Sequence, residues 1–110
     1  MDIRQGQTEV LVFPVKDSVG VPVNITTSFA DGCFTVYGGY GQITVEPLDA
    51  GWAVINYDSV NDALEITLEP AQTRSLKFGW QHNYEVWFEG ALGRLLVATG
   101  DANVLRSEEC

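Results

Sequence analysis

The sequence predicts an all-β protein, an immunoglobulin-like antiparallel sandwich of two sheets with about seven to nine strands and one short helical turn. Apolar and polar residues alternate along short segments, and turn residues such as glycine, proline and asparagine separate these segments. The Cys…Trp…Cys spacing of antibody domains is absent, which leaves a small β-barrel as the second choice. A chain of 110 residues suits a single domain over residues 1–110.

The first half of the chain is expected to contain only strands and turns. Pro14 cannot donate a ladder hydrogen bond, so the strand that contains it is expected at a sheet edge. Residues 17–20 are predicted to form a turn, and residues 38–41 a flexible glycine-rich bend. The expected strands cover residues 8–15, 21–25, 29–37, 42–46 and 52–57.

The second half adds the helical turn and a hairpin. A strand over residues 64–69 is followed by Pro70, which suits the first position of a helical turn near 70–76. Strands over 84–89 and 94–100 flank a tight turn at 90–93, and Val104 with Leu105 is expected to add part of a last strand. Strand alternation then predicts a core of Val10, Val12, Val23, Ile25, Phe34, Val36, Ile43, Val45, Val54, Leu64, Ile66, Leu68, Tyr84, Val86, Phe88, Leu95 and Val97.

The charge balance limits the partners that we expect. Six basic residues face 15 acidic ones, and the resulting net charge of −9 repels nucleic-acid phosphates and anionic lipid headgroups. This charge favours solubility and suits docking onto a basic protein surface. No apolar run has the length of a membrane span, and the polar start of the chain does not resemble a secretory signal. We therefore expect a protein that is made in the host cytoplasm and either stays there or leaves by a route other than signal-directed secretion.

The two cysteines are too few and too far apart for a disulfide framework or a metal site. Cys33 precedes an apolar segment and is expected as a small core or near-surface residue. Cys110 ends the chain after two glutamates, where an exposed thiol could cross-link to another chain, although the neighbouring negative charges slow its attack.

Catalytic and metal-binding patterns are weak. His82 is the only histidine, and we interpret it as a loop residue bonded to the backbone rather than as a catalytic base. Neither Asp58 with Asp62 nor Asp101 with Asn103 has the spacing of a calcium loop. The glutamates expected on the solvent faces of strands are Glu65, Glu69, Glu85 and Glu89. We expect no catalytic residues, no cofactor and no metal, and hence no enzyme.

Aromatic residues supply the strongest candidate for a binding site. Strand alternation turns Trp87 outward if its neighbours face the core. Trp80 and Tyr40 are further candidates, and either Tyr37 or Trp52 could join them. Exposed tryptophan is enriched at protein interfaces and also stacks on sugars, so a protein interface and a carbohydrate site both remain open.

Several motifs, in order, carry a family resemblance. Residues 3–8 lead into the first strand, and Lys16–Thr26 reads Lys-Asp-x-x-Gly-x-Pro-Val-Asn-Ile-Thr. Ile66–Leu76 reads Ile-Thr-Leu-x-Pro-Ala-Gln-Thr-x-x-Leu, and residues 84–100 form a Tyr-x-Val-x-Phe strand, a glycine turn and a strand closing in glycine. The order of these motifs resembles that of small β-sandwich proteins of tailed bacteriophages. Residues 33–57 depart from the family pattern, because they are rich in aromatic residues and glycine.

The resemblance implies a non-enzymatic virion structural protein that binds other virion subunits and forms homo-oligomers on the particle. Decoration or stabilisation of the capsid or collar is the first expectation, and a tail or baseplate adaptor is the alternative. A carbohydrate-binding module for host adsorption and a small hydrolase that depends on His82 are the competing classes.

Overall fold

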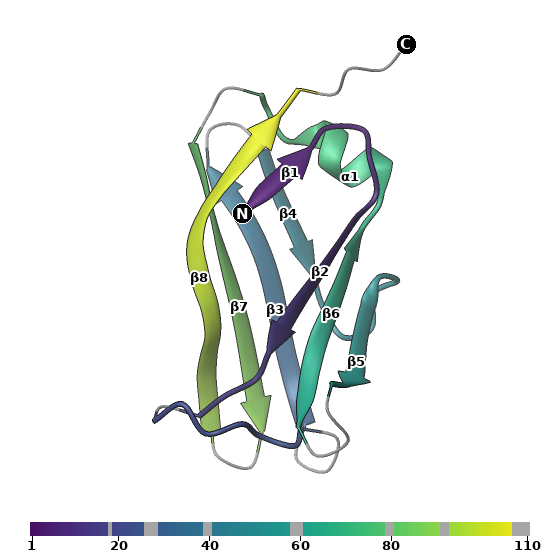
Figure 1. The fold of residues 1–110 in the computed structure, drawn as a ribbon. Coiled ribbons are helices and arrows are strands. Elements are labelled where there is room, and N and C mark those ends of the chain that lie inside the picture. The colour runs from purple at the N-terminus through teal and green to yellow at the C-terminus, as the bar shows by residue number, and fades with distance from the viewer. Residues whose placement is uncertain are drawn as a thin grey trace.

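The computed structural model describes residues 1–17, 19–25, 29–38, 41–57, 61–78, 81–90 and 93–106. These residues form two β-sheets that pack face to face, with one short helix between two of the strands (Figure 1). The elements are β1 (Asp2–Arg4), β2 (Glu9–Pro14), β3 (Phe29–Gly38), β4 (Gly41–Val45), β5 (Trp52–Asn56), β6 (Asp62–Leu68), α1 (Pro70–Ser75), β7 (Gln81–Gly90) and β8 (Gly93–Leu105).

The topology confirms the predicted immunoglobulin-like sandwich. One sheet has the strand order β1-β8-β7-β3-β4 and the other has the order β2-β6-β5. All neighbouring strands are antiparallel except β1, which runs parallel to the end of β8. The chain changes sheet between β1 and β2, between β2 and β3, between β4 and β5, and between β6 and β7, as expected for a sandwich with crossed connections. α1, the helix of the described part of the chain, is far too short to span a membrane.

Most of the predicted core residues lie between the two sheets. Phe34, Val36, Leu64, Ile66 and Val86 are fully buried. Val23, Val54, Tyr84, Leu95 and Val97 are partly buried and pack against this cluster. The described core also contains residues that the strand pattern did not select, namely Ile3, Val15, Leu76, Ala102 and Val104.

The predicted orientation of the first strand is wrong. Val10 and Val12 are 56% and 41% exposed, whereas Leu11 and Phe13 pack against the core. The segment is apolar on both faces, so alternation could not decide which face turns inward. The prediction that Pro14 marks an edge strand is confirmed, because β2 lies at one edge of its sheet and Pro14 is its last residue.

A second correction concerns residues 21–25, which form no strand. Lys16 and Pro22 make an isolated bridge, and the buried Asp62 fixes the rest of the segment. Its carboxylate Oδ2 accepts the N–H of Ile25 at 3.0 Å, and its backbone bonds Val15 and Val23. A side chain thus replaces a strand ladder, which a pattern of apolar residues does not reveal.

β1, the end of β8 and the helix α1 meet at one end of the sandwich (Figure 1). β1 was not predicted as a strand; it pairs with residues 103–105, and Ile3 is buried there. The predicted helical turn is confirmed, with Pro70 in its first turn. The Thr73 hydroxyl donates to Gln7 O at 2.9 Å, which fixes α1 to the loop between β1 and β2.

Candidate functional site

The outer face of the five-stranded sheet carries the predicted residue Trp87 in the middle of β7. The neighbouring residues Val86 and Phe88 are buried, and the indole of Trp87 is half-buried on the opposite face, as alternation predicts. Cys33 on β3 and Leu96 on β8 lie directly opposite it across the two ladders. The β7–β8 register shifts between Val86 and Trp87, and such a bulge re-aims side chains locally.

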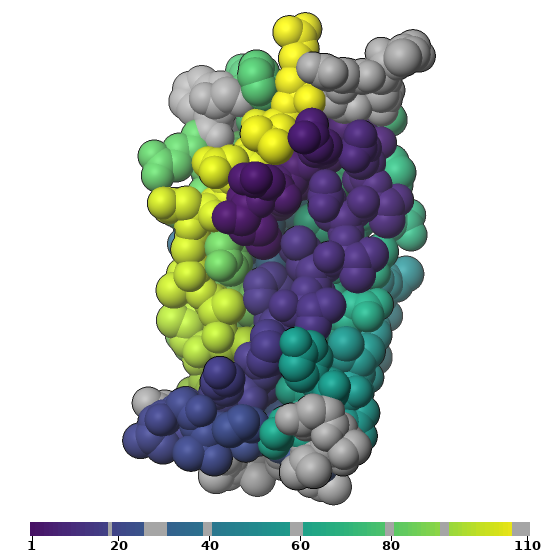
Figure 2. Space-filling view, viewed as in Figure 1, coloured from purple at the N-terminus to yellow at the C-terminus, as the bar shows by residue number. Residues whose placement is uncertain are grey.

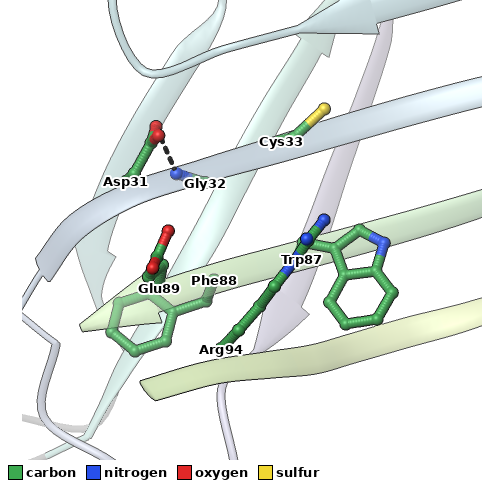
Figure 3. Close-up of a pocket in the computed structure, with 7 residues that line it drawn as sticks. All are labelled: Asp31, Gly32, Cys33, Trp87, Phe88, Glu89 and Arg94. Carbon is green, nitrogen blue, oxygen red and sulfur yellow. Dashed lines mark hydrogen bonds between the residues drawn. The ribbon is translucent and has the colours of Figure 1, made fainter. Parts of the chain in front are cut away.

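Two neighbouring side chains, Glu85 and Arg94, hold the indole of Trp87 directly, and Tyr37 in turn holds Glu85. The indole Nε1–H donates to Glu85 Oε2 at 3.1 Å, and the Tyr37 hydroxyl donates to Glu85 Oε1 at 3.2 Å. The Arg94 guanidinium lies over the ring, 4.5 Å from its centroid, which is within cation–π range. Figure 3 shows Arg94 extending from β8 toward the indole. This partly buried aromatic residue therefore has a fixed orientation before any partner binds.

We call this region the Trp87 surface; it consists of Cys33, Tyr37, Glu85, Trp87, Arg94 and Leu96. Tyr37 and Leu96 are 37% and 45% exposed, so the surface offers apolar area beyond the indole. Partial burial raises the pKa of the Tyr37 hydroxyl, and the charge and hydrogen bond of Glu85 raise it further. The phenol therefore stays a hydrogen-bond donor throughout the physiological pH range.

A pocket of about 190 Å³ borders the Trp87 surface (Figure 3). Its lining includes the exposed carboxylates Asp31 and Glu89, which lie opposite one another on β3 and β7. Pockets for small-molecule ligands usually measure roughly 300–1,000 Å³, so this one is better matched to a single side chain projecting from another protein.

The same pocket lacks the arrangement of a thiol-dependent enzyme. The Cys33 thiol, on the outer face, is 3.3 Å from the Thr35 hydroxyl. The single histidine, His82, is fully buried on the inner face of β7, so the sheet separates it from Cys33. His82 Nε2 donates to Lys77 O at 3.1 Å, since a carbonyl can only accept.

The structure thus corrects the position of His82, which lies in a strand and not in a loop. The prediction that it bonds a backbone group is confirmed. The described residues give no support to the calcium candidates: Asp62 points into the interior and Asn103 donates to Asp2, whereas Asp58 lies outside the described residues. Within the described ranges, no group of three or more His, Cys, Asp or Glu side chains is arranged to hold a metal.

Three of the other predicted site residues, Trp80, Tyr40 and Cys110, lie outside the described residues. Trp52 lies on the second sheet, where it packs against the core. Sequence reasoning missed Glu85 and Arg94 as partners of Trp87. The signal was present, because Glu85 precedes Trp87 by two positions on the same strand face and the glycine hairpin returns Arg94 to its side.

Comparison with known proteins adds no relative: no protein-family model and no curated protein matches this chain. The class of the molecule is therefore given by its fold, an immunoglobulin-like β-sandwich, and by the Trp87 surface on its larger sheet.

Proposed function

We propose that this chain is a non-enzymatic structural protein of a bacteriophage particle, which binds other virion subunits through the Trp87 surface. The observation that carries the binding role is Trp87 itself, a partly buried tryptophan on the outer face of β7 that is held between Glu85 and Arg94. Fixed aromatic and arginine side chains dominate the energy of protein interfaces, because little conformational entropy is lost when they bind. The resemblance in motif order supplies the phage context.

The charge of the chain indicates the chemistry of the partner surface. The net charge is −9, and the exposed carboxylates of Asp31 and Glu89 border the Trp87 surface. A partner with a basic rim around an apolar centre complements this arrangement, and opposite charges speed the encounter. Repetition of the subunit on a particle multiplies the strength of contacts that are individually weak.

A carbohydrate-binding module is the less favoured function. Sugars stack on the open face of an aromatic ring, and here the Arg94 guanidinium occupies one face of the Trp87 indole. The second aromatic residue of the surface, Tyr37, is tied by its hydroxyl to Glu85. A single, partly covered indole is therefore better suited to contact with a protein than to stacking on a sugar.

Gold-labelled antibodies against the purified chain test this proposal on particles from the lysate in which the chain is produced. Regular labelling over the heads, or labelling at the collar, is the expected result. Labelling confined to the tail tip keeps the virion role but moves the chain to a tail or baseplate adaptor. Particles without label, with the chain found only in the soluble fraction, contradict the proposal.

A further inference from the structure

The free edge of β2 is a second candidate contact surface of the molecule. β2 hydrogen-bonds to β6 on one side and ends the three-stranded sheet on the other. In sandwiches of the constant immunoglobulin type a further strand pairs at this position, giving a four-stranded sheet. Here β1 pairs with β8 instead, so alternate backbone N–H and C=O groups of β2 point away from the sheet.

The side chains of β2 make this edge apolar. Val10 and Val12 are exposed, and Figure 2 shows the atoms of β2 at the surface between β8 and β6. Proteins usually protect a free edge with lysine, proline or a bulge. β2 has a proline only at its last residue, Pro14, and its ladder to β6 runs without a register shift. The four residues Val10–Phe13 are all apolar and uncharged, and the valines and Phe13 are strong strand formers.

We infer that β2 pairs with β2 of a second copy of this chain, antiparallel and about a two-fold axis, to form one continuous six-stranded sheet. Directly opposite residues in an antiparallel pair lie on the same face. A register centred on Leu11 therefore places Val10 of each copy opposite Val12 of the other, and Leu11 opposite itself. The exposed valines gain cross-strand partners, and Pro14, which lacks an N–H, falls at the end of the new ladder.

The charge on β2 itself does not oppose this pairing, although the whole chain is acidic. The one charged residue of β2 is Glu9, whose carboxylate accepts the backbone N–H of Arg4 at 3.1 Å. In the antiparallel register the two Glu9 residues are four positions apart, or about 14 Å at the rise of a β-strand. This separation exceeds the Debye length of about 8 Å at physiological ionic strength, so their repulsion is largely screened.

The expected dimer is weak, because two short strands bury less surface than a standard protein interface. Sedimentation velocity of the purified chain from about 1 µM to about 1 mM covers the corresponding range of affinity. We expect the sedimentation coefficient to rise from monomer to dimer across this range. A chain that stays monomeric at the highest concentration overturns the inference.

Two lysine variants with equal charge identify the surface involved. Val12→Lys places a charge beside the free edge, and Leu48→Lys places the same charge at a fully exposed residue outside β2. We expect Val12→Lys to remain monomeric at every concentration, and Leu48→Lys to dimerise as the natural chain does. Dimerisation of both variants, or loss of dimerisation in both, contradicts pairing through β2.

Amide hydrogen exchange separates strand pairing from simple stacking of apolar faces. Pairing at the edge adds hydrogen bonds to alternate residues of β2, so their exchange slows at high protein concentration. Unchanged exchange of the β2 amides in a dimeric sample overturns the inference. These measurements need no phage particle, so their failure is distinct from failure of the proposed virion role.

Discussion

The indole of Trp87 donates a hydrogen bond to the carboxylate of Glu85, two residues earlier on the same face of β7. Arg94 lies over the indole, and Tyr37 bonds the other oxygen of the Glu85 carboxylate. The orientation of Trp87 is therefore set by its neighbours in the free protein. This arrangement lowers the entropy lost on binding and makes the indole a suitable anchor for a partner.

Replacing Glu85 should release the indole without unfolding the protein. Glu85→Ala removes the acceptor, so the Nε1–H of Trp87 becomes solvent-exchanging and the affinity for particles falls by a few-fold. Glu85→Gln is the matched control, since its amide oxygen still accepts the hydrogen bond. The ¹⁵N–¹H signal of the indole, assigned with Trp87→Phe, reports the change. An unchanged signal in Glu85→Ala shows that Glu85 does not position Trp87.

The raised pKa of Tyr37 predicts a titration at high pH. Partial burial and the Glu85 carboxylate both disfavour the tyrosinate, so Tyr37 should ionise above the ordinary value of 10.0. Its contribution to stability is fully present below that ordinary pKa and is lost as the pH rises through the raised one. Ultraviolet titration measures the pKa of the Tyr37 hydroxyl, and the Tyr37→Phe variant identifies its signal. Glu85→Gln should lower the pKa, and no change on this substitution contradicts the assignment.

The sequence was sufficient for the two-sheet class, because alternation in β4, β6 and β7 is regular and the glycine turn between β7 and β8 is strong. It was insufficient where both faces of a strand are apolar, as at Val10 and Val12, or where tertiary pairing decides, as in β1. The outward position of Trp87 followed from alternation. The contact between Arg94 and the Trp87 indole depends on the pairing of β7 with β8. Alternation within a single strand does not reveal such a contact.

Asp62 is predicted to hold the segment before β3 in place. Asp62→Ala leaves the buried N–H of Ile25 without its acceptor, which should lower the free energy of unfolding by about 1–3 kcal/mol. Asp17→Ala is the control, because the Asp17 carboxylate bonds Val19 and Val21 at an exposed turn where water can replace it. Urea unfolding of both variants gives the difference. Equal losses contradict a special role for Asp62.

Gly51 is predicted to tolerate no side chain. Its φ of 97° disfavours other residues, and an added Cβ meets the carbonyl oxygen of Thr67. Gly20 has a similar φ of 87°, but open space surrounds it, so Gly20→Ala should cost only the backbone term of about 1–2 kcal/mol. Gly51→Ala should cost clearly more, because the Gly51–Thr67 hydrogen bond must also shift. Thermal unfolding of both variants measures the two costs, and an equal cost shows that the backbone at Gly51 can move away.

The central claim is that Trp87 anchors this chain to a phage particle, and co-sedimentation with particles stripped of the chain tests it most directly. Trp87→Glu should weaken binding by about 2 kcal/mol, or roughly thirty-fold in Kd, as expected for an interface anchor. Leu48→Glu carries the same added charge at an exposed residue away from the Trp87 surface, and it should bind as the natural chain does. If a folded Trp87→Glu variant binds particles with unchanged affinity, the Trp87 surface is not the interface.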